Sequence, residues 1–289
     1  MLVTSLLIYP VKSMGGVAVD RAGIEPWGLA GDRRWGLIDA SGQKITAREV
    51  HGLLRFHAEV LGEHTIRISD RDGASILAAA PVGEGQVRVS HSRRGYARLA
   101  AAGVSDWLTD RIGMPVRLVW QDDPTVRTLA EDKGGLPGER LSLADAGPLL
   151  LASQASMAQL NAWITADADL PDSPDLDPAD LSAGPGLSVA LDIVRFRPNV
   201  VIDGEEPFAE DAWPKVRIGN LTFRTTMVCD RCVMTTIDPV TLAGGKEPIR
   251  TLARRRRWNR KTWFGTRLVP LGTGTISVGD AVEPENAYD

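Results

Sequence analysis

The sequence predicts an α+β fold that is rich in β-strand. Short segments in which apolar and polar residues alternate recur along the chain, Gly, Asp, Asn and Pro separate them, and helical periodicity is confined to a few stretches. The 289 residues are 43% hydrophobic and 24% charged with a net charge of −4, an ordinary composition for one or two domains. No stretch approaches the roughly 20 apolar residues of a membrane span. We therefore expect a cytoplasmic protein with no membrane association.

We predict a first domain over residues 1–122. Trp35, Leu37 and Ile45 alternate around the turn residues 39–42, which predicts a hairpin. A helix is predicted over 104–112, with Ser105 or Asp106 as its N-cap and Gly113 ending it. Alternation over residues 116–120 predicts a strand after that helix.

The second predicted domain spans residues 123–289. Ser153 or Ser156 is expected to cap a helix with one apolar face, and the Pro/Asp/Gly-rich residues 165–186 are expected to form a loop. Residues 216–227 alternate around Gly219 and Asn220, which predicts a second hairpin, and alternation resumes over 233–237. A helix that begins at Pro248 interrupts the later strands.

The only two cysteines, Cys229 and Cys232, form a C-x-x-C pair between these strand-like stretches. Such a pair has three usual meanings: half of a zinc site, a thiol-disulfide redox centre, or one reactive thiolate beside a structural cysteine. A zinc site needs about four ligands, and the chain offers no second cysteine pair and only distant histidines. Redox pairs usually lie at a helix N-terminus, and no helix start is predicted here. One thiolate ligand for a softer metal remains open.

The residues around this pair resemble the signature of MOSC-domain proteins. The resemblance starts from the run 227–239 (MVCDRCVMTTIDP) and continues, in the expected order, in residues 8–13 (IYPVKS), 31–35 (GDRRW), 45–48 (ITAR), 196–200 (FRPNV) and 274–280 (GTISVGD). It spans nearly the whole chain. Among family members the chain looks like the mitochondrial amidoxime-reducing component and its bacterial relatives.

This resemblance implies an N-terminal β-barrel-like domain packed on a MOSC β-barrel with a few helices, and a bound molybdenum cofactor. Cys232 would ligate molybdenum, and the residues matching the family's other cofactor positions are Lys12, Ser13, Arg33, Arg197, Asn199, Asp230 and Arg231. Two departures affect the fine contacts. Ala146 and Gly147 stand where some relatives have hydroxyl residues, and Arg267 stands where others have Tyr or Asn, so Arg267 is expected to supply a compensating cation.

Plainer roles compete for each of these residues. Lys12 and Ser13 follow a predicted strand, a position typical of a solvated turn. Arg33 and Arg34 are adjacent and could be a pair of exposed surface cations. Arg197 could pair with a nearby acid such as Asp203. Cys229 is expected to be a small buried residue that does not ligate the metal.

The function implied by the resemblance is reduction of N-hydroxylated compounds: amidoximes, hydroxylamines and N-hydroxylated base analogues. Because no cysteines are left for an iron-sulfur cluster, we expect a separate electron donor, a flavoprotein or a ferredoxin. The alternative is a non-catalytic cofactor carrier or sulfur-transfer module with Cys232 as a persulfide acceptor. A third is a thiol oxidoreductase that needs both cysteines.

Four consecutive arginines, Arg254 to Arg257, precede Trp258, and clustered arginines beside an aromatic residue are typical of some nucleic-acid-binding sites. We favour the basic end of a short helix instead. As an intermediate hypothesis, this patch docks an acidic electron donor, and charge reversal at Arg255 and Arg256 should then slow reduction.

Overall fold

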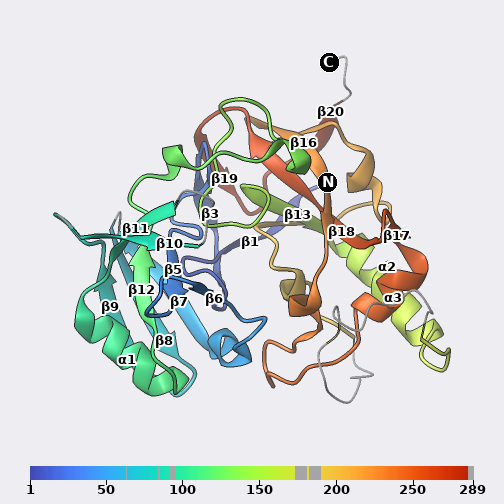
Figure 1. The fold of residues 1–289 in the computed structure, drawn as a ribbon. Coiled ribbons are helices and arrows are strands. Elements are labelled where there is room, and N and C mark those ends of the chain that lie inside the picture. The colour runs from blue at the N-terminus through green and yellow to red at the C-terminus, as the bar shows by residue number, and fades with distance from the viewer. Residues whose placement is uncertain (63, 84, 91–94, 173–180, 182–189, 286–289) are drawn as a thin grey trace. The chain divides into compact units, whose positions relative to one another are not determined.

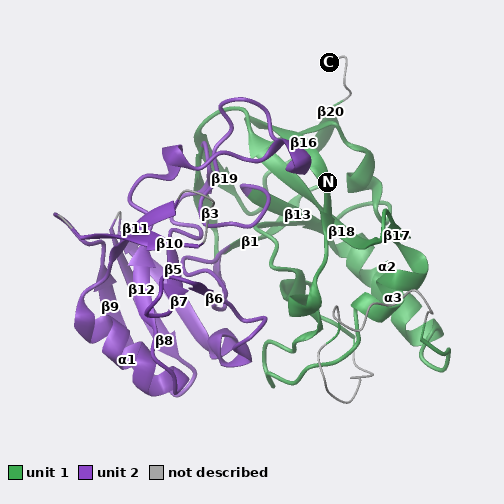
Figure 2. Cartoon of the chain, in the orientation of Figure 1, with its two compact units in different colours: residues 1–7, 19–25, 149–289 green, residues 8–18, 26–148 purple. Residues whose placement is uncertain are grey.

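The computed structural model describes residues 1–62, 64–83, 85–90, 95–172, 181 and 190–285 (Figure 1). The chain forms two compact units, and both are discontinuous in sequence (Figure 2). Unit 1 contains residues 1–7, 19–25 and 149–289, and unit 2 contains residues 8–18 and 26–148. Strands predominate in both, as the sequence predicts, and the described residues include three α-helices. None of these helices is long and apolar enough to cross a membrane.

Unit 1 is built on a long sheet in the order β1-β14-β13-β18-β16-β15-β20. These strands are β1 (Val3–Ile8), β13 (Leu149–Ser153), β14 (Val200–Ile202), β15 (Lys215–Ile218), β16 (Leu221–Asp230), β18 (Lys261–Pro270) and β20 (Val282–Glu285). The two ends of this order meet, because Val3 exchanges backbone hydrogen bonds with Gly279 and Asp280, and Val282 donates to the carbonyl of Met1. Closure removes the exposed sheet edges, and a β-barrel results.

The remaining elements of unit 1 cover or extend this barrel. Helix α2 (Gln154–Ala166) packs on β13, and α3 (Ile249–Arg255) packs on β18. The short strand β17 (Arg257–Trp258) pairs with β18, and β19 (Gly274–Ser277) pairs with β3 (Arg21–Glu25). The predicted Ser153 cap is confirmed, since its hydroxyl accepts from the Ser156 amide at 3.3 Å. Strands β13 and β14 and almost all of β18 are buried along their length, and the core contains Leu6, Leu151, Val200, Ile218, Phe223 and Leu268.

Unit 2 contains a five-stranded sheet, β10-β11-β12-β5-β6, and a three-stranded sheet, β7-β8-β9. Their bounds are β5 (Trp35–Ile38), β6 (Lys44–Ile45), β7 (Phe56–Gly62), β8 (Thr65–Asp70), β9 (Ser75–Ala79), β10 (Gln86–Val89), β11 (Gly95–Leu99) and β12 (Arg117–Trp120). The predicted hairpin is β5-β6, and the Asp39 carboxylate holds its turn by accepting from the amides of Ser41 and Gln43. The described residues also include the short strands β2 (Val17–Val19) and β4 (Gly28–Leu29).

Helix α1 (Ala102–Ile112) packs against β9 and β12 of unit 2. Gly113 ends it in the left-handed conformation with φ 78°, as predicted. The predicted cap is wrong, because the helix begins three residues before Ser105 and its N-cap is Ala101. The Ser105 hydroxyl is buried and accepts from the Leu118 amide instead, so a tertiary contact uses the group that a cap would have used.

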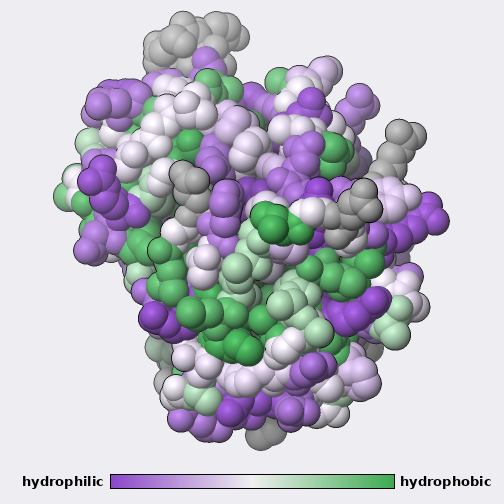
Figure 3. Space-filling view, turned by 90° about the vertical axis from the view of Figure 1, so that its left-hand side faces the viewer, coloured by the Kyte–Doolittle hydropathy of each residue, from purple (hydrophilic) through white to green (hydrophobic). Residues whose placement is uncertain are grey.

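Apolar residues gather in the lower middle of the face that lies on the left-hand side of Figure 1 (Figure 3). Large exposed hydrophobic residues of unit 2 are Val60, Leu61, Leu77, Val82, Tyr96, Val126 and Leu136. The predicted loop over residues 165–186 lies largely outside the described residues, apart from its start up to 172 and residue 181.

Candidate functional site

The two cysteines lie where β16 of unit 1 ends. Asp230 is the last residue of β16 and is paired with Trp263 of β18. Between the pairs Val228–Thr266 and Asp230–Trp263, β16 advances two residues and β18 three, so β18 carries a bulge. The bulge depends on Gly265, which has φ 73° and leaves no room for a Cβ, since that atom would lie 2.9 Å from the carbonyl oxygen of Leu151.

Cys232 is the N-cap residue of one 3₁₀ turn, Val233–Thr236. The strand predicted over 233–237 is therefore wrong, and so is the expectation that no helical turn starts at the pair. The physical reason is local: the amide and hydroxyl of Thr235 both donate to the Cys232 carbonyl at 3.0 Å, and the Thr236 hydroxyl donates to the Val233 carbonyl at 2.7 Å. Cys232 is half-buried, and its sulfur makes no hydrogen bond to a described residue.

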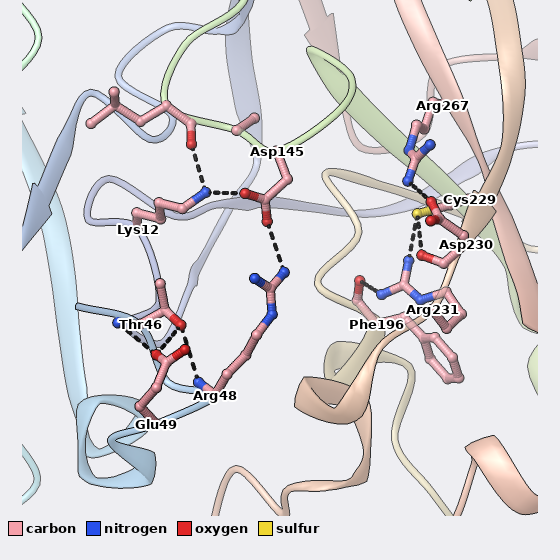
Figure 4. Close-up of polar contacts among 12 residues, drawn as sticks. Lys12, Thr46, Arg48, Glu49, Asp145, Phe196, Cys229, Asp230, Arg231 and Arg267 are labelled. Atoms are coloured by element: carbon pink, nitrogen blue, oxygen red, sulfur yellow. Dashed lines mark hydrogen bonds and ion pairs between the residues drawn. The ribbon is translucent and has the colours of Figure 1, made fainter. Parts of the chain in front are cut away.

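Cys229 is buried, as predicted, but it has a polar partner (Figure 4). One guanidinium nitrogen of Arg231 donates to the Cys229 sulfur at 2.8 Å, and another donates to the Phe196 carbonyl at 2.8 Å. The same guanidinium lies 5.1 Å from the centre of the Phe196 ring. Arg231 therefore clamps the segment between the cysteines to the chain before Arg197. Its Nε is buried without a hydrogen-bond partner among the described residues.

Asp230 forms ion pairs with two cations from β18. Its carboxylate contacts Lys261 at 2.9 Å and also binds Arg267. Although partial burial opposes it, the attraction of Arg267 and Lys261 holds the pKa of Asp230 well below its usual range. Burial lowers the pKa of Arg267, but the nearby Cys229 sulfur and Asp230 carboxylate outweigh burial and raise it. One terminal nitrogen of Arg267 is buried without a hydrogen-bond partner among the described residues.

Unit 2 carries a second cluster, around Lys12 and Asp145 (Figure 4). The buried Lys12 ammonium donates to the Leu143 carbonyl at 2.8 Å and to the Asp145 carboxylate at 2.6 Å. Arg48 also pairs with Asp145, at 3.4 Å. Burial lowers the pKa of Lys12 to about 8, against the attraction of Asp145. Lys12 is thus a buried cation and not the solvated turn residue of the plainer interpretation.

Two further arginines belong to the Lys12 surroundings. Arg33 pairs with Asp32 at 2.6 Å and lies 4.6 Å from the centre of the Tyr9 ring. Arg127 donates to the carbonyls of Ser142 and Ala144, and burial lowers the pKa of Arg127 to about 10. Both cations also act on Lys12 and lower its pKa. Positive charge therefore exceeds negative charge in this cluster, and such a cluster suits an anionic ligand.

Backbone strain coincides with three of the predicted site residues. Ser13, Arg33 and Arg197 have φ values of 72°, 48° and 58°, and the described residues include only seven non-glycine residues with positive φ. This conformation is uncommon for residues with a Cβ and clusters at ligand-binding positions. The sequence could not reveal this strain, because none of these positions carries the glycine or asparagine that usually signals it.

Asn199 has a structural part in the barrel of unit 1. Its side-chain oxygen accepts from the Leu150 amide at 3.2 Å, and its side-chain nitrogen donates to the Leu7 carbonyl at 3.1 Å, so it links the strands on either side of it. Any contact of Asn199 or Arg197 with a cofactor stays a prediction.

Sequence reasoning did not select five charged residues of these clusters. Asp32 and Arg48 belong to the quoted runs 31–35 and 45–48, and Asp145 immediately precedes Ala146, so these three were near a signal. Lys261 and Arg127 carry no sequence signal, since each acts through a partner far along the chain. Among the described residues, no group of three or more His, Cys, Asp and Glu side chains is arranged to hold a metal ion.

Two family profiles match the chain. The MOSC N-terminal beta barrel domain matches residues 1–115, and the MOSC domain matches residues 138–283. Mitochondrial amidoxime-reducing component 1 of Homo sapiens is 29% identical over 97% of this chain and 82% of its own length. Molybdenum cofactor sulfurase of Danio rerio is 30% identical over 98% of this chain, which spans about a third (34%) of that relative. A solution structure of a Bordetella bronchiseptica protein matches 34% of this chain and 86% of its own at 13% identity, with a TM-score of 0.26.

Proposed function

The chain belongs to the MOSC family, and from that premise we propose that it is a molybdenum-cofactor-dependent reductase of N-hydroxylated compounds. Similarity to an amidoxime-reducing component over 97% of the chain supports this substrate class. The balanced reaction converts an N–OH group, two electrons and two protons into an N–H group and water. The electrons come from a separate donor protein, and no substrate beyond the class is implied.

The residues of unit 1 fit the cofactor. Cys232 offers one half-buried sulfur with no hydrogen-bond partner among the described residues, and a thiolate is the ligand that a soft metal prefers. Arg231 and Arg267 each have one buried N–H group without a partner among the described residues, and such groups usually have one. The polar edge of a pterin supplies acceptors for them. This pairing of a presented sulfur with partnerless guanidinium groups is the observation that carries the proposal.

When bound, the cofactor supplies two-electron oxygen-atom transfer at the metal. The protein's own residues hold and orient it. Cys232, two residues beyond the end of β16, would supply a metal ligand, while Arg231 fixes the chain on either side by binding Cys229 and the Phe196 carbonyl. Asp230 pairs with both Arg267 and Lys261 and so holds their side chains in place. In unit 2, the cations around Lys12 would suit an anionic group such as a phosphate.

The similarity to molybdenum cofactor sulfurases favours a second candidate function, a carrier or sulfur-transfer module without turnover. This candidate also uses Cys232 and binds the same cofactor. It differs in one observable property, because a carrier holds metal and pterin but does not reduce substrate.

The experiment compares wild type, Cys232→Ser and the matched control Cys229→Ser, all expressed in a host that makes the cofactor. Molybdenum and released pterin are measured together with benzamidoxime reduction by a chemical reductant. Stoichiometric metal and turnover in wild type and Cys229→Ser, with both lost in Cys232→Ser, supports the reductase. Metal without turnover in wild type supports the carrier, and a wild type without metal or pterin overturns both.

A further inference from the structure

The β17-β18 hairpin of unit 1 ends in a strained turn. Its two connecting residues, Asn259 and Arg260, have φ values of 51° and 59°. A two-residue hairpin turn with both φ values positive strongly prefers Asn-Gly, because glycine has no Cβ. Arg260 is exposed, and its backbone is strained at a position where glycine would not be. Strain of this kind persists where a side chain has a function.

An aromatic side chain is held rigidly beside this turn. Trp258 is 42% exposed and stacks on the buried Trp263, with ring centres 5.2 Å apart and an interplanar angle of 11°. The Trp263 indole N–H donates to the Trp258 carbonyl at 2.9 Å. An exposed tryptophan that is already fixed loses little entropy on binding, and such residues are typical anchors of protein interfaces.

The hairpin belongs to a strongly basic segment. Residues 248–279 contain eight Arg and Lys residues and no Asp or Glu. The arginines at the end of α3 are paired within the unit: Arg254 and Arg255 share the Asp167 carboxylate, and Arg256, the residue after the helix, pairs with Asp211. The patch suggested by the sequence is therefore largely paired. Arg260, by contrast, makes no ion pair within the described part of the chain.

The hairpin is bonded directly to the segment that carries Cys232. The Arg231 amide donates to the Thr262 carbonyl at 2.8 Å, Trp263 is paired with Asp230, and Lys261 binds the Asp230 carboxylate at 2.9 Å. A partner seated on Trp258 and Arg260 would thus contact the element that adjoins the candidate metal ligand.

We propose that the tip of this hairpin, Trp258 to Lys261, is the docking site for an acidic electron-donor protein of the [2Fe–2S] ferredoxin type. The inference rests on the proposed function, because two one-electron transfers from reduced donor molecules supply the two electrons of each turnover. Complementary charge accelerates such transient encounters. Arg260 and Trp258 could also contact a nucleic acid, and binding of an oligonucleotide is therefore one outcome of the test.

The test compares two electron sources on the holoenzyme. Benzamidoxime reduction is driven either by an acidic plant-type [2Fe–2S] ferredoxin or by reduced methyl viologen, which needs no docking surface. The variants are Arg260→Glu, Arg260→Gly and Trp258→Ala, and the matched control is Arg21→Glu, an exposed cation on β3. Binding of the ferredoxin and binding of oligothymidylate, as the nucleic-acid probe, are also measured directly by calorimetry at low ionic strength.

We expect Arg260→Glu and Trp258→Ala to lower kcat/KM for ferredoxin by at least about threefold at low salt, the range of single interface charges. The viologen-driven rate stays within about twofold in the same variants, and high salt removes the Arg260→Glu effect. Arg260→Gly gives a smaller loss with an unchanged or raised Tm, which separates docking from folding. Arg21→Glu behaves as wild type.

Three results would overturn the docking site. In the first, the wild-type protein neither binds the ferredoxin nor accepts electrons from it at low salt. In the second, the hairpin variants keep wild-type ferredoxin kinetics, and in the third they lose only binding to oligothymidylate. Wild type that contains the cofactor but shows no viologen-driven reduction refutes the proposed function itself. These failures are therefore distinguishable.

Discussion

Replacing Lys12 by methionine should stabilise the cofactor-free protein while weakening its hold on an anion. The Lys12 ammonium is buried, and burial lowers its pKa from 10.5 to about 8. A difference of about 2.5 pKa units corresponds to about 3 kcal/mol by which the folded state disfavours the charged form near pH 7. Methionine has a similar shape and removes this penalty.

Two losses offset part of that gain. The Leu143 carbonyl loses its 2.8 Å donor, which costs roughly 1–2 kcal/mol. Asp145 loses one ion pair, but its side chain is 58% exposed and keeps Arg48, so solvent limits this loss. The expected balance for Lys12→Met at pH 7 is a gain of about 1 kcal/mol in unfolding free energy.

The pH dependence gives the clearer signature. Because the pKa of Lys12 is lower in the folded state, the unfolded chain binds more protons between pH 8 and 10.5. Wild-type stability therefore rises through this range, by up to about 3 kcal/mol from this group, and the Lys12→Met protein lacks that rise.

The assay is denaturant unfolding of cofactor-free protein, followed by tryptophan fluorescence at pH 7 and at pH values up to 10.5. Arg21→Met, at an exposed position on β3, is the control and should change stability by less than about 0.5 kcal/mol. In holoprotein, Lys12→Met should retain less pterin and molybdenum. A Lys12→Met protein that is less stable than wild type by more than about 1 kcal/mol at pH 7, with no change in that difference at high pH, would refute the reasoning.

The remaining predictions concern unit 1. Cys232→Ser should lose bound molybdenum, whereas Cys229→Ser, which alters a neighbour of Arg231 and Arg267 but not the proposed ligand, should weaken retention by no more than about tenfold; metal analysis decides, and equal loss in both contradicts the assignment. Arg267→Met should leave Asp230 with Lys261 alone and destabilise the protein by roughly 3 kcal/mol at neutral pH. That difference should shrink as pH falls and Asp230 takes up a proton in the variant; a pH-independent difference in denaturant unfolding would argue against it. Asp167→Asn removes the carboxylate that two arginines of α3 share, and hydrogen bonding to the exposed Arg255 is the main cause of its lowered pKa. Wild-type stability from this group is present at neutral pH and lost on acidification, so the variant should be less stable at pH 7 and show a smaller loss toward pH 3 by circular dichroism, and identical acid unfolding curves would contradict this.

Local patterns in the sequence were sufficient where structure follows from neighbouring residues. The β5-β6 hairpin, the Ser153 cap and the Gly113 stop were each predicted from a few consecutive residues, and the structure confirms them. Alternation also predicted the β15-β16 hairpin that leads to the cysteines. These features depend on side-chain periodicity and turn chemistry, which the sequence displays directly.

The same local reasoning failed where a residue had a choice of partners. Ser105 was expected to cap α1 but accepts from Leu118, and the threonines after Cys232 were expected in a strand but bond back to form a 3₁₀ turn. Both residue types can bond to the backbone in several ways, and the surrounding fold decides which one is used.

By itself the sequence determined the strand-rich fold, the family and the cysteine pair, because these rest on residue identity, order and spacing. Only the tertiary structure decided that the barrel closes through Val3 and Asp280, that Arg231 binds the Cys229 sulfur, and that Lys12 is buried beside Asp145. Burial and charge pairing between residues far apart in the chain set these properties, and no local pattern records them.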